Sequence, residues 1–190
     1  MEDKSSFEIS TRFESLKRAF LILFFTIGLI YLVLPGASSI NDFPPLPAGV
    51  KSDLDGDTWQ NPNLVAYFSD HRRQFVTDFY KHIFAKKLIG ISLPLIVLNH
   101  PPEAAYKYIR DQQESTFLEE YVFPLRESFF VNGYEPEIEN QILRRKADFV
   151  GNHIYFKEQP YNGKTTLRFY PTSIISRIFI LNRINSSTFV

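Results

Sequence analysis

The stretch Ala19–Leu34, "AFLILFFTIGLIYLVL", decides how the rest of the chain is organised. It contains no charged side chain, is apolar on every face of a helix, and is followed by Pro35-Gly36. The preceding Leu16 and the aliphatic stems of two basic residues extend it toward the ~20 residues that a membrane span requires. We therefore predict one transmembrane helix over residues 16–35. A buried core helix is the alternative, but such a helix more often carries a polar stripe.

The charges around this segment predict its orientation. Arg12, Lys17 and Arg18 lie immediately before it, whereas the first stretch after Gly36 contains no lysine or arginine. Because positive charge stays on the cytoplasmic side, residues 1–15 form a cytoplasmic tail and the rest of the chain is extracytoplasmic. A cleaved signal peptide shares these features. The apolar run exceeds the usual 7–15 residues of a signal core, which favours an uncleaved signal anchor.

Composition limits the remaining possibilities. The chain of 190 residues, 44% of them hydrophobic, is long enough for one domain with a hydrophobic core and too short for two domains that each have a sizeable core. Acidic and basic residues balance at 21 each, which argues against a nucleic-acid partner. Cysteine is absent, so disulfides and thiolate metal sites are excluded. The apolar run Leu88–His100 is too short for a second span, and we predict a single-pass protein.

After the span we expect a proline-containing spacer over residues 36–60 and a folded domain over residues 61–190. Asn61-Pro62 predicts the start of a helix whose apolar face continues to Phe84 and which ends at Gly90. The branched residues of "ISLPLIVL" predict a central strand, with a bulge or an edge required at Pro94.

Further elements are expected beyond that strand. Helices are predicted over residues 100–112, over residues 116–123 from a capping box of Thr116 and Glu119, and over residues 135–152. A turn is predicted at Asn132-Gly133.

The segment 153–170, "HIYFKEQPYNGKTTLRFY", predicts a hairpin around Asn162-Gly163. The tail 173–184 fits either a helix or a strand, and its isoleucine content favours a strand. Together these elements predict an α+β fold with helices packed on a mostly antiparallel sheet.

Three aspartates at alternate positions, Asp53, Asp55 and Asp57, surround Gly56 shortly after the span. Alternate carboxylates suit calcium, which prefers oxygen ligands. The stretch resembles a fragment of the aspartate-rich calcium repeats of the thrombospondin type, and this resemblance implies calcium as the cofactor. It departs from that pattern at Thr58, where a glycine is usual, and has only one copy. The other interpretation, which we favour, is a solvated Asp-Gly turn.

Among the four histidines, His100 is the candidate catalytic residue. It follows the predicted central strand at its carboxyl end, where functional groups often lie. A loop histidine that caps the next helix is the simpler interpretation. No nucleophile elbow or phosphate-binding glycine loop is present in the sequence.

The sequence therefore favours a membrane-anchored protein, bound to the lipid bilayer through its N-terminal helix. Its extracytoplasmic domain is expected to be an interaction or structural module that binds a protein of the envelope or lumen. The alternative is a membrane-tethered enzyme of unrecognised class with a polar site near His100.

Overall fold

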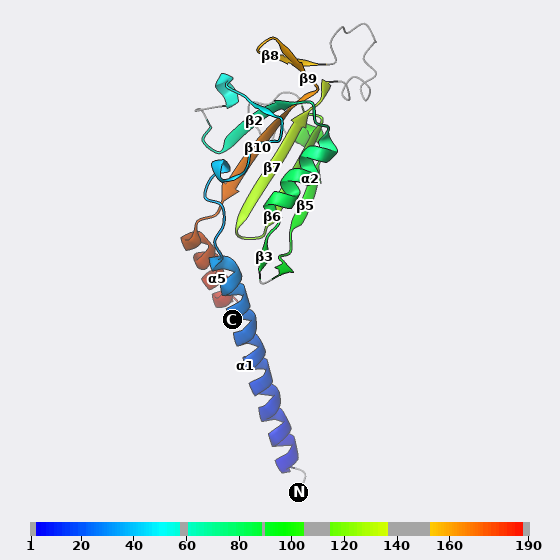
Figure 1. The fold of residues 1–190 in the computed structure, drawn as a ribbon. Coiled ribbons are helices and arrows are strands. Elements are labelled where there is room, and N and C mark those ends of the chain that lie inside the picture. The colour runs from blue at the N-terminus through cyan, green and yellow to red at the C-terminus, as the bar shows by residue number, and fades with distance from the viewer. Residues whose placement is uncertain (1–2, 58–60, 89, 105–114, 137–152, 188–190) are drawn as a thin grey trace. The chain divides into compact units, whose positions relative to one another are not determined.

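The computed structural model describes residues 3–57, 61–88, 90–104, 115–136 and 153–187. The chain divides into two compact units. One consists of residues 1–36 and 172–190, and the other of residues 37–171. Helix α1 (Asp3–Val33) and helix α5 (Ile174–Ser187) belong to the first unit. All strands and helix α2 belong to the second, which we call the sheet domain (Figure 1).

The sheet domain has one main helix, α2 (Arg73–Phe84), and three short 3-10 helices, η1 (Ile40–Asp42), η2 (Asp55–Asp57) and η3 (Pro102–Ala104), among its described residues. Its strands are β1 (Val50–Lys51), β2 (Leu64–Ser69), β3 (Lys87–Leu88), β4 (Ile91–Ser92), β5 (Ile96–His100), β6 (Phe117–Phe123), β7 (Glu127–Tyr134), β8 (Ile154–Phe156), β9 (Gln159–Tyr161) and β10 (Gly163–Pro171).

Six strands form the main sheet in the order β1-β2-β10-β7-β6-β5, and every neighbouring pair is antiparallel. Two small hairpins, β3-β4 and β8-β9, stand beside it. Helix α2 packs on β6 and β7 (Figure 1). The predicted α+β class with a mostly antiparallel sheet is therefore confirmed.

The core lies between α2 and the sheet. Strand side chains alternate between two faces, so every second residue of β6, β7 and β10 points toward α2. Phe129 stands at the centre of this aromatic core, with its ring centroid 4.6 Å from that of Phe43 and 5.5 Å from that of Phe84. Helix α2 contributes Val76, Tyr80 and Phe84, which are at most 2% exposed.

The segment that we expected to be a spacer contributes to this core. Ile40 and Leu46 are each 2% exposed, and Phe43 packs against the same cluster. Ser39 caps η1 in a capping box closed by Asp42. The sheet domain therefore begins at Ala37 and not at residue 61, because three apolar side chains in a proline-rich stretch are enough to anchor it.

The helix predicted from Asn61 is wrong in its first part. Residues Leu64–Ser69 form β2, with all six residues buried, and α2 begins only at Arg73. Asn61 accepts a hydrogen bond from the backbone N–H of Asn63 in a turn before the strand. Burial on both faces, between β1 and β10, outweighs the local capping signal.

Two local signals in the next pair of strands were also misleading. The predicted helix at Thr116 is strand β6, and the Thr116 hydroxyl accepts a hydrogen bond from the Glu135 backbone N–H. The predicted turn at Asn132-Gly133 lies inside β7. Gly133 is required there because the Phe117 ring of the neighbouring strand lies against it, and a Cβ would come within 2.1 Å of that ring.

The hairpin predicted around Asn162-Gly163 is shifted. The chain reverses at Lys157 and Glu158, which both have positive φ, between β8 and β9. Gly163 instead begins β10, which pairs with β2 and β7. The Asn162 backbone N–H donates to Asp70 Oδ1 at 3.0 Å and so fixes the entry into that strand.

The tail favoured as a strand is helix α5. The strand predicted to be central divides into β4 and β5 around Pro94, and β5 is an edge of the sheet. The helix predicted over 100–112 contains η3, and its remainder, like most of that over 135–152, lies outside the described residues.

Candidate functional site

Helix α1 carries the segment predicted to span a membrane. Its stretch Arg12–Val33 has 22 residues and a mean hydropathy of 2.0, and at 1.5 Å per residue it extends about 33 Å. The hydrocarbon layer of a bilayer is about 30 Å thick. Only 6% of the apolar stretch is buried, with Leu16 70% exposed and Ile22 68% exposed. Helix α1 is thus long and apolar enough to cross a membrane, and it lacks the burial of a core helix.

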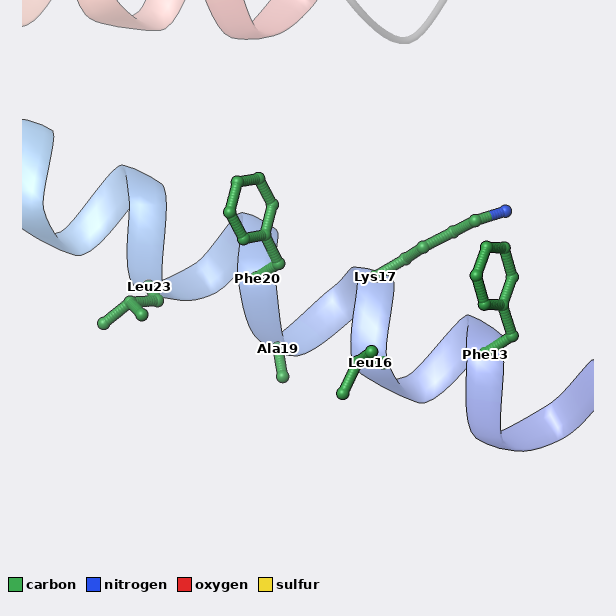
Figure 2. Close-up of a pocket in the computed structure, with 6 residues that line it drawn as sticks. All are labelled: Phe13, Leu16, Lys17, Ala19, Phe20 and Leu23. Carbon is green, nitrogen blue, oxygen red and sulfur yellow. The ribbon is translucent and has the colours of Figure 1, made fainter. Parts of the chain in front are cut away.

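A hollow beside α1 does not form a ligand site. Figure 2 shows its lining, which comes from α1 alone: Phe13, Leu16, Lys17, Ala19, Phe20 and Leu23. Lys17 is the charged member, and its ammonium pairs with Glu14 at 2.9 Å and lies 4.6 Å from the centre of the Phe13 ring. Side chains of a single helix bound the hollow on one side only. The hollow is therefore a groove between neighbouring side chains on the surface of α1, and the Glu14–Lys17 pair lies at one end of it.

Helix α5 packs against α1 within the same unit. Arg177 is 5% exposed, and its guanidinium donates to the carbonyls of Leu32 at 3.2 Å and Thr172 at 2.7 Å. A cation at the last turn of α1 is favourable because the helix dipole is negative there. The exposed side of α5 is apolar, with Ile175 82% exposed and Phe179 65% exposed. Both helices of this unit thus present apolar surface outward.

The aspartates of the candidate calcium site do not converge. Asp53 pairs with Lys157 at 2.5 Å, and both side chains are exposed. Asp57 is buried, accepts a hydrogen bond from Ser52 Oγ at 2.5 Å and pairs with Lys164 at 2.7 Å. The described residues contain no group of three or more side chains placed to hold a metal ion. The stretch Asp55–Asp57 forms the short helix η2.

His100 ends β5 and faces away from α2. Its Nε2 lies 2.9 Å from Glu120 Oε2 on the adjacent strand, and both side chains are half-buried. Its ring stacks on Phe130 with the centroids 6.3 Å apart. Glu120 and Glu119 point to opposite faces of β6, so these adjacent carboxylates cannot act on one substrate atom. His100 therefore belongs to a histidine–carboxylate pair, which can hold a proton or orient a polar group.

A second polar cluster, which the sequence analysis missed, lies on the α2 face. The Arg73 guanidinium binds Glu119 Oε1 at 2.7 Å and Asn99 Oδ1 at 3.1 Å. Its backbone N–H donates to Glu135 Oε1 at 2.7 Å. Glu119 also accepts from the Tyr121 hydroxyl at 3.0 Å, and burial is the main cause that raises the pKa of Tyr121. The cluster joins the start of α2 to β5 and β6, so it fixes the position of the sheet edge.

Strands β1 and β5 are the two edges of the main sheet, and β5 is the longer of them. In the part of the chain that the structure describes, its one ladder neighbour is β6. Ile96, Val97 and Leu98 are between 40% and 45% exposed. The stretch Ile91–Asn99 contains no charged residue. Natural edge strands usually carry lysine, proline or a covering segment that prevents pairing with another chain. An apolar, uncharged edge strand is consequently a surface suited to strand addition.

The sequence held a signal for this edge that was interpreted differently. The uncharged branched run led us to predict a central strand, because a central strand is apolar on both faces. An edge strand that pairs with another molecule has the same composition, so composition alone does not separate the two.

Comparison with protein-family models, curated proteins and solved structures finds no match.

Proposed function

We propose that this protein is a membrane-anchored interaction module. Helix α1 crosses the bilayer as a signal anchor with the N-terminus in the cytoplasm, and the sheet domain lies outside the cytoplasm. Support comes from the length and exposed apolar surface of α1 and from the basic residues before it. The domain binds an extended segment of a second protein in the envelope or lumen.

The observation that carries the proposal is the apolar edge strand β5. Backbone N–H and C=O groups along the free side of an edge strand can pair with an added strand, and alternate side chains give selectivity. Ile96 and Leu98 lie on one face of the sheet, and Val97 on the other. The expected partner is a strand with apolar side chains at alternate positions. The Arg73 cluster holds β5 in place before the partner arrives, which lowers the entropy cost of binding.

Site-directed photo-crosslinking of the full-length protein in its own membranes tests this function. A photoreactive residue at Ile96 or Leu98 should cross-link to one short partner segment, at positions in that segment that alternate. Ile91 is the matched control, because it is 73% exposed on β4 and lies outside the main sheet. Equal cross-linking at Ile91, or scattered positions without a common segment, would refute strand addition. A second copy of the chain as the partner would show as a cross-linked homodimer and would refute the hetero-partner.

A lysine in the edge gives an independent check of the same surface. Leu98 is 41% exposed, so Leu98→Lys adds a charge to the edge strand at a position that water already reaches. We expect at least a tenfold loss of partner binding with the fold intact. Ile91→Lys should bind normally.

The alternative is a membrane-tethered enzyme, and the His100–Glu120 pair is the observation that favours it. A histidine that is hydrogen-bonded to a carboxylate can act as a general base. No substrate class follows from the pair itself. His100→Gln retains a polar side chain of similar reach, and loss of turnover with the fold intact would support a catalytic role for His100.

A further inference from the structure

Arg168 on β10 is a buried cation that has no counter-charge among the residues that the structure describes. Its side chain lies on the sheet face opposite α2, and the residue is only 7% exposed. Across the described residues it makes no ion pair, and its Nε has no hydrogen-bond partner. A buried charge is strongly unfavourable unless it is paired and hydrogen-bonded. The described residues thus leave the Arg168 guanidinium able to bind an additional anion.

Two more unpaired polar atoms lie beside it. Thr166 is two residues before Arg168 on the same strand and face, and Asn132 of β7 lies directly opposite Thr166. Both are buried, and Thr166 Oγ1 and Asn132 Nδ2 lack hydrogen-bond partners. The Asn132 carbonyl oxygen is already bound by Ser115 Oγ at 2.5 Å, which leaves the amide as a donor. Side chains opposite each other have Cβ atoms about 5 Å apart, so these donors converge.

The other charged groups of this face are already paired. Glu120 binds His100, and it is separated from Arg168 by Phe130 in the same cross-strand row. Two strand spacings of about 4.8 Å place the Glu120 and Arg168 backbones about 10 Å apart. Lys164 pairs with Asp57. No carboxylate of this face is thus left for Arg168 among the residues described.

The face opens to solvent at the end of β10. Tyr170 is the next residue after Arg168 that points to this side, and it is 41% exposed. At the other end the β8-β9 hairpin covers the face, because Phe156 stacks on Phe68 with the ring centroids 4.3 Å apart. A ligand would therefore reach Arg168 from the Tyr170 side.

We propose that Arg168, Thr166 and Asn132 form a binding site for a carboxylate group. A guanidinium binds a carboxylate through two parallel hydrogen bonds, and the hydroxyl and amide donors can bind its remaining lone pairs. One cation with two neutral donors matches a singly charged carboxylate better than a phosphate dianion. The carboxylate belongs either to a small organic acid or to an acidic side chain or C-terminus of a protein. This site is on the face of the sheet and does not depend on strand addition at β5.

Thermal unfolding of the full-length protein in detergent micelles tests the site. The probes are acetate, succinate, inorganic phosphate, a short peptide with a free C-terminus and its C-terminally amidated form. Chloride at the same ionic strength is the reference. Carboxylates should raise the melting temperature above the chloride value, and this rise should grow with concentration. Stabilisation by acetate and succinate marks a site for small acids. Stabilisation by the free peptide alone, lost on amidation, marks a protein C-terminus.

Variants separate a binding site from a structural role. Arg168→Met keeps the apolar stem and removes the charge, and it should weaken carboxylate binding at least tenfold. Without ligand it should melt no lower than the wild-type protein, because an unpaired buried charge has been removed. Thr166→Val provides a second variant with a smaller loss of binding. Lys164→Met is the matched control on the same strand and face, and it should bind normally.

Four results would overturn the proposal. The first is that carboxylates do not shift the melting temperature of the wild-type protein, and the second is that Arg168→Met retains such a shift. The third is that Arg168→Met without ligand melts well below the wild-type protein. The fourth is that inorganic phosphate stabilises the protein and carboxylates do not.

Discussion

Replacing Leu46 by alanine tests whether the proline-rich stretch before residue 50 is part of the sheet domain. Leu46 is 2% exposed and packs in the cluster that contains Phe84 and Phe129. A leucine-to-alanine change at such a site costs the transfer free energy of the lost methyl groups plus a cavity term, about 2–5 kcal/mol in total. A domain of this size is stable by about 5–15 kcal/mol, so the loss is a large fraction.

Urea unfolding of the isolated sheet domain, Ala37–Pro171, followed by circular dichroism, measures this loss. With an m-value of about 1.5 kcal/mol/M, the midpoint should fall by about 1.3–3.3 M. Leu54→Ala is the matched control, because Leu54 also lies within residues 36–60, which the sequence predicts as a spacer, but is 48% exposed. Its cost should stay near 0.5 kcal/mol, as is usual for surface changes. Equal midpoints for the two variants would show that the stretch is a spacer, and the assignment of Leu46 to the core would be wrong.

Three further outcomes are expected in the sheet domain. Gly133→Ala should lower the unfolding free energy by about 1–3 kcal/mol, since a new Cβ overlaps the Phe117 ring, and urea unfolding measures it. Burial raises the pKa of Tyr80 and of Tyr121, so the folded state keeps protons that the unfolded state releases above pH ~10. The unfolding free energy should therefore be constant just below that pH and fall above it by about 1.4 kcal/mol per pH unit for each tyrosine. Tyr121→Phe should reduce this slope, and an unchanged slope would contradict the burial of the Tyr121 hydroxyl. Calcium chelation should leave the melting temperature unchanged, because the aspartates within Asp53–Asp57 do not converge, and a calcium-dependent shift would restore the metal site.

The parts of the fold that the sequence predicts correctly are those with a strong pattern over many residues. The apolar run of α1 and the amphipathic face of α2 persist over several turns, and both are helices. The α+β class follows from the mixture of such helices with β-branched runs. Long patterns are reliable because many side chains must all suit the same environment, either the apolar side or the polar side of the element.

Short local signals failed where distant strands determine the structure. A capping box at Thr116 and an Asn-Gly pair at Asn132 are each valid turn or helix signals, but both lie in strands that the whole sheet stabilises. The role of Gly133 depends on Phe117, which lies on a different strand. Such a pairing is not visible until the register between strands is known.

The same limit applies to the candidate sites. His100 could be chosen from its position after an apolar run, but its partner Glu120 is set by the register of β5 and β6. Arg168 and Thr166 alternate within "KTTLRFY", which predicts a shared strand face, whereas Asn132 joins them only through the pairing of β7 with β10. Residues from one strand are predictable as a group, and residues from two strands are not.

The membrane topology is the central claim, and the absence of cysteine allows a direct measurement of it. A single cysteine is introduced either at Ser5, in α1 before its apolar stretch Arg12–Val33, or at Tyr155, which is 68% exposed in the sheet domain. Intact cells are then treated with a membrane-impermeant maleimide, and lysed cells provide the full-labelling control. We predict labelling of Tyr155→Cys and none of Ser5→Cys in intact cells, on a protein that stays in the membrane fraction after alkaline carbonate extraction. Labelling of Ser5→Cys alone, or release of the labelled protein by carbonate, would contradict a sheet domain held outside the cytoplasm by α1.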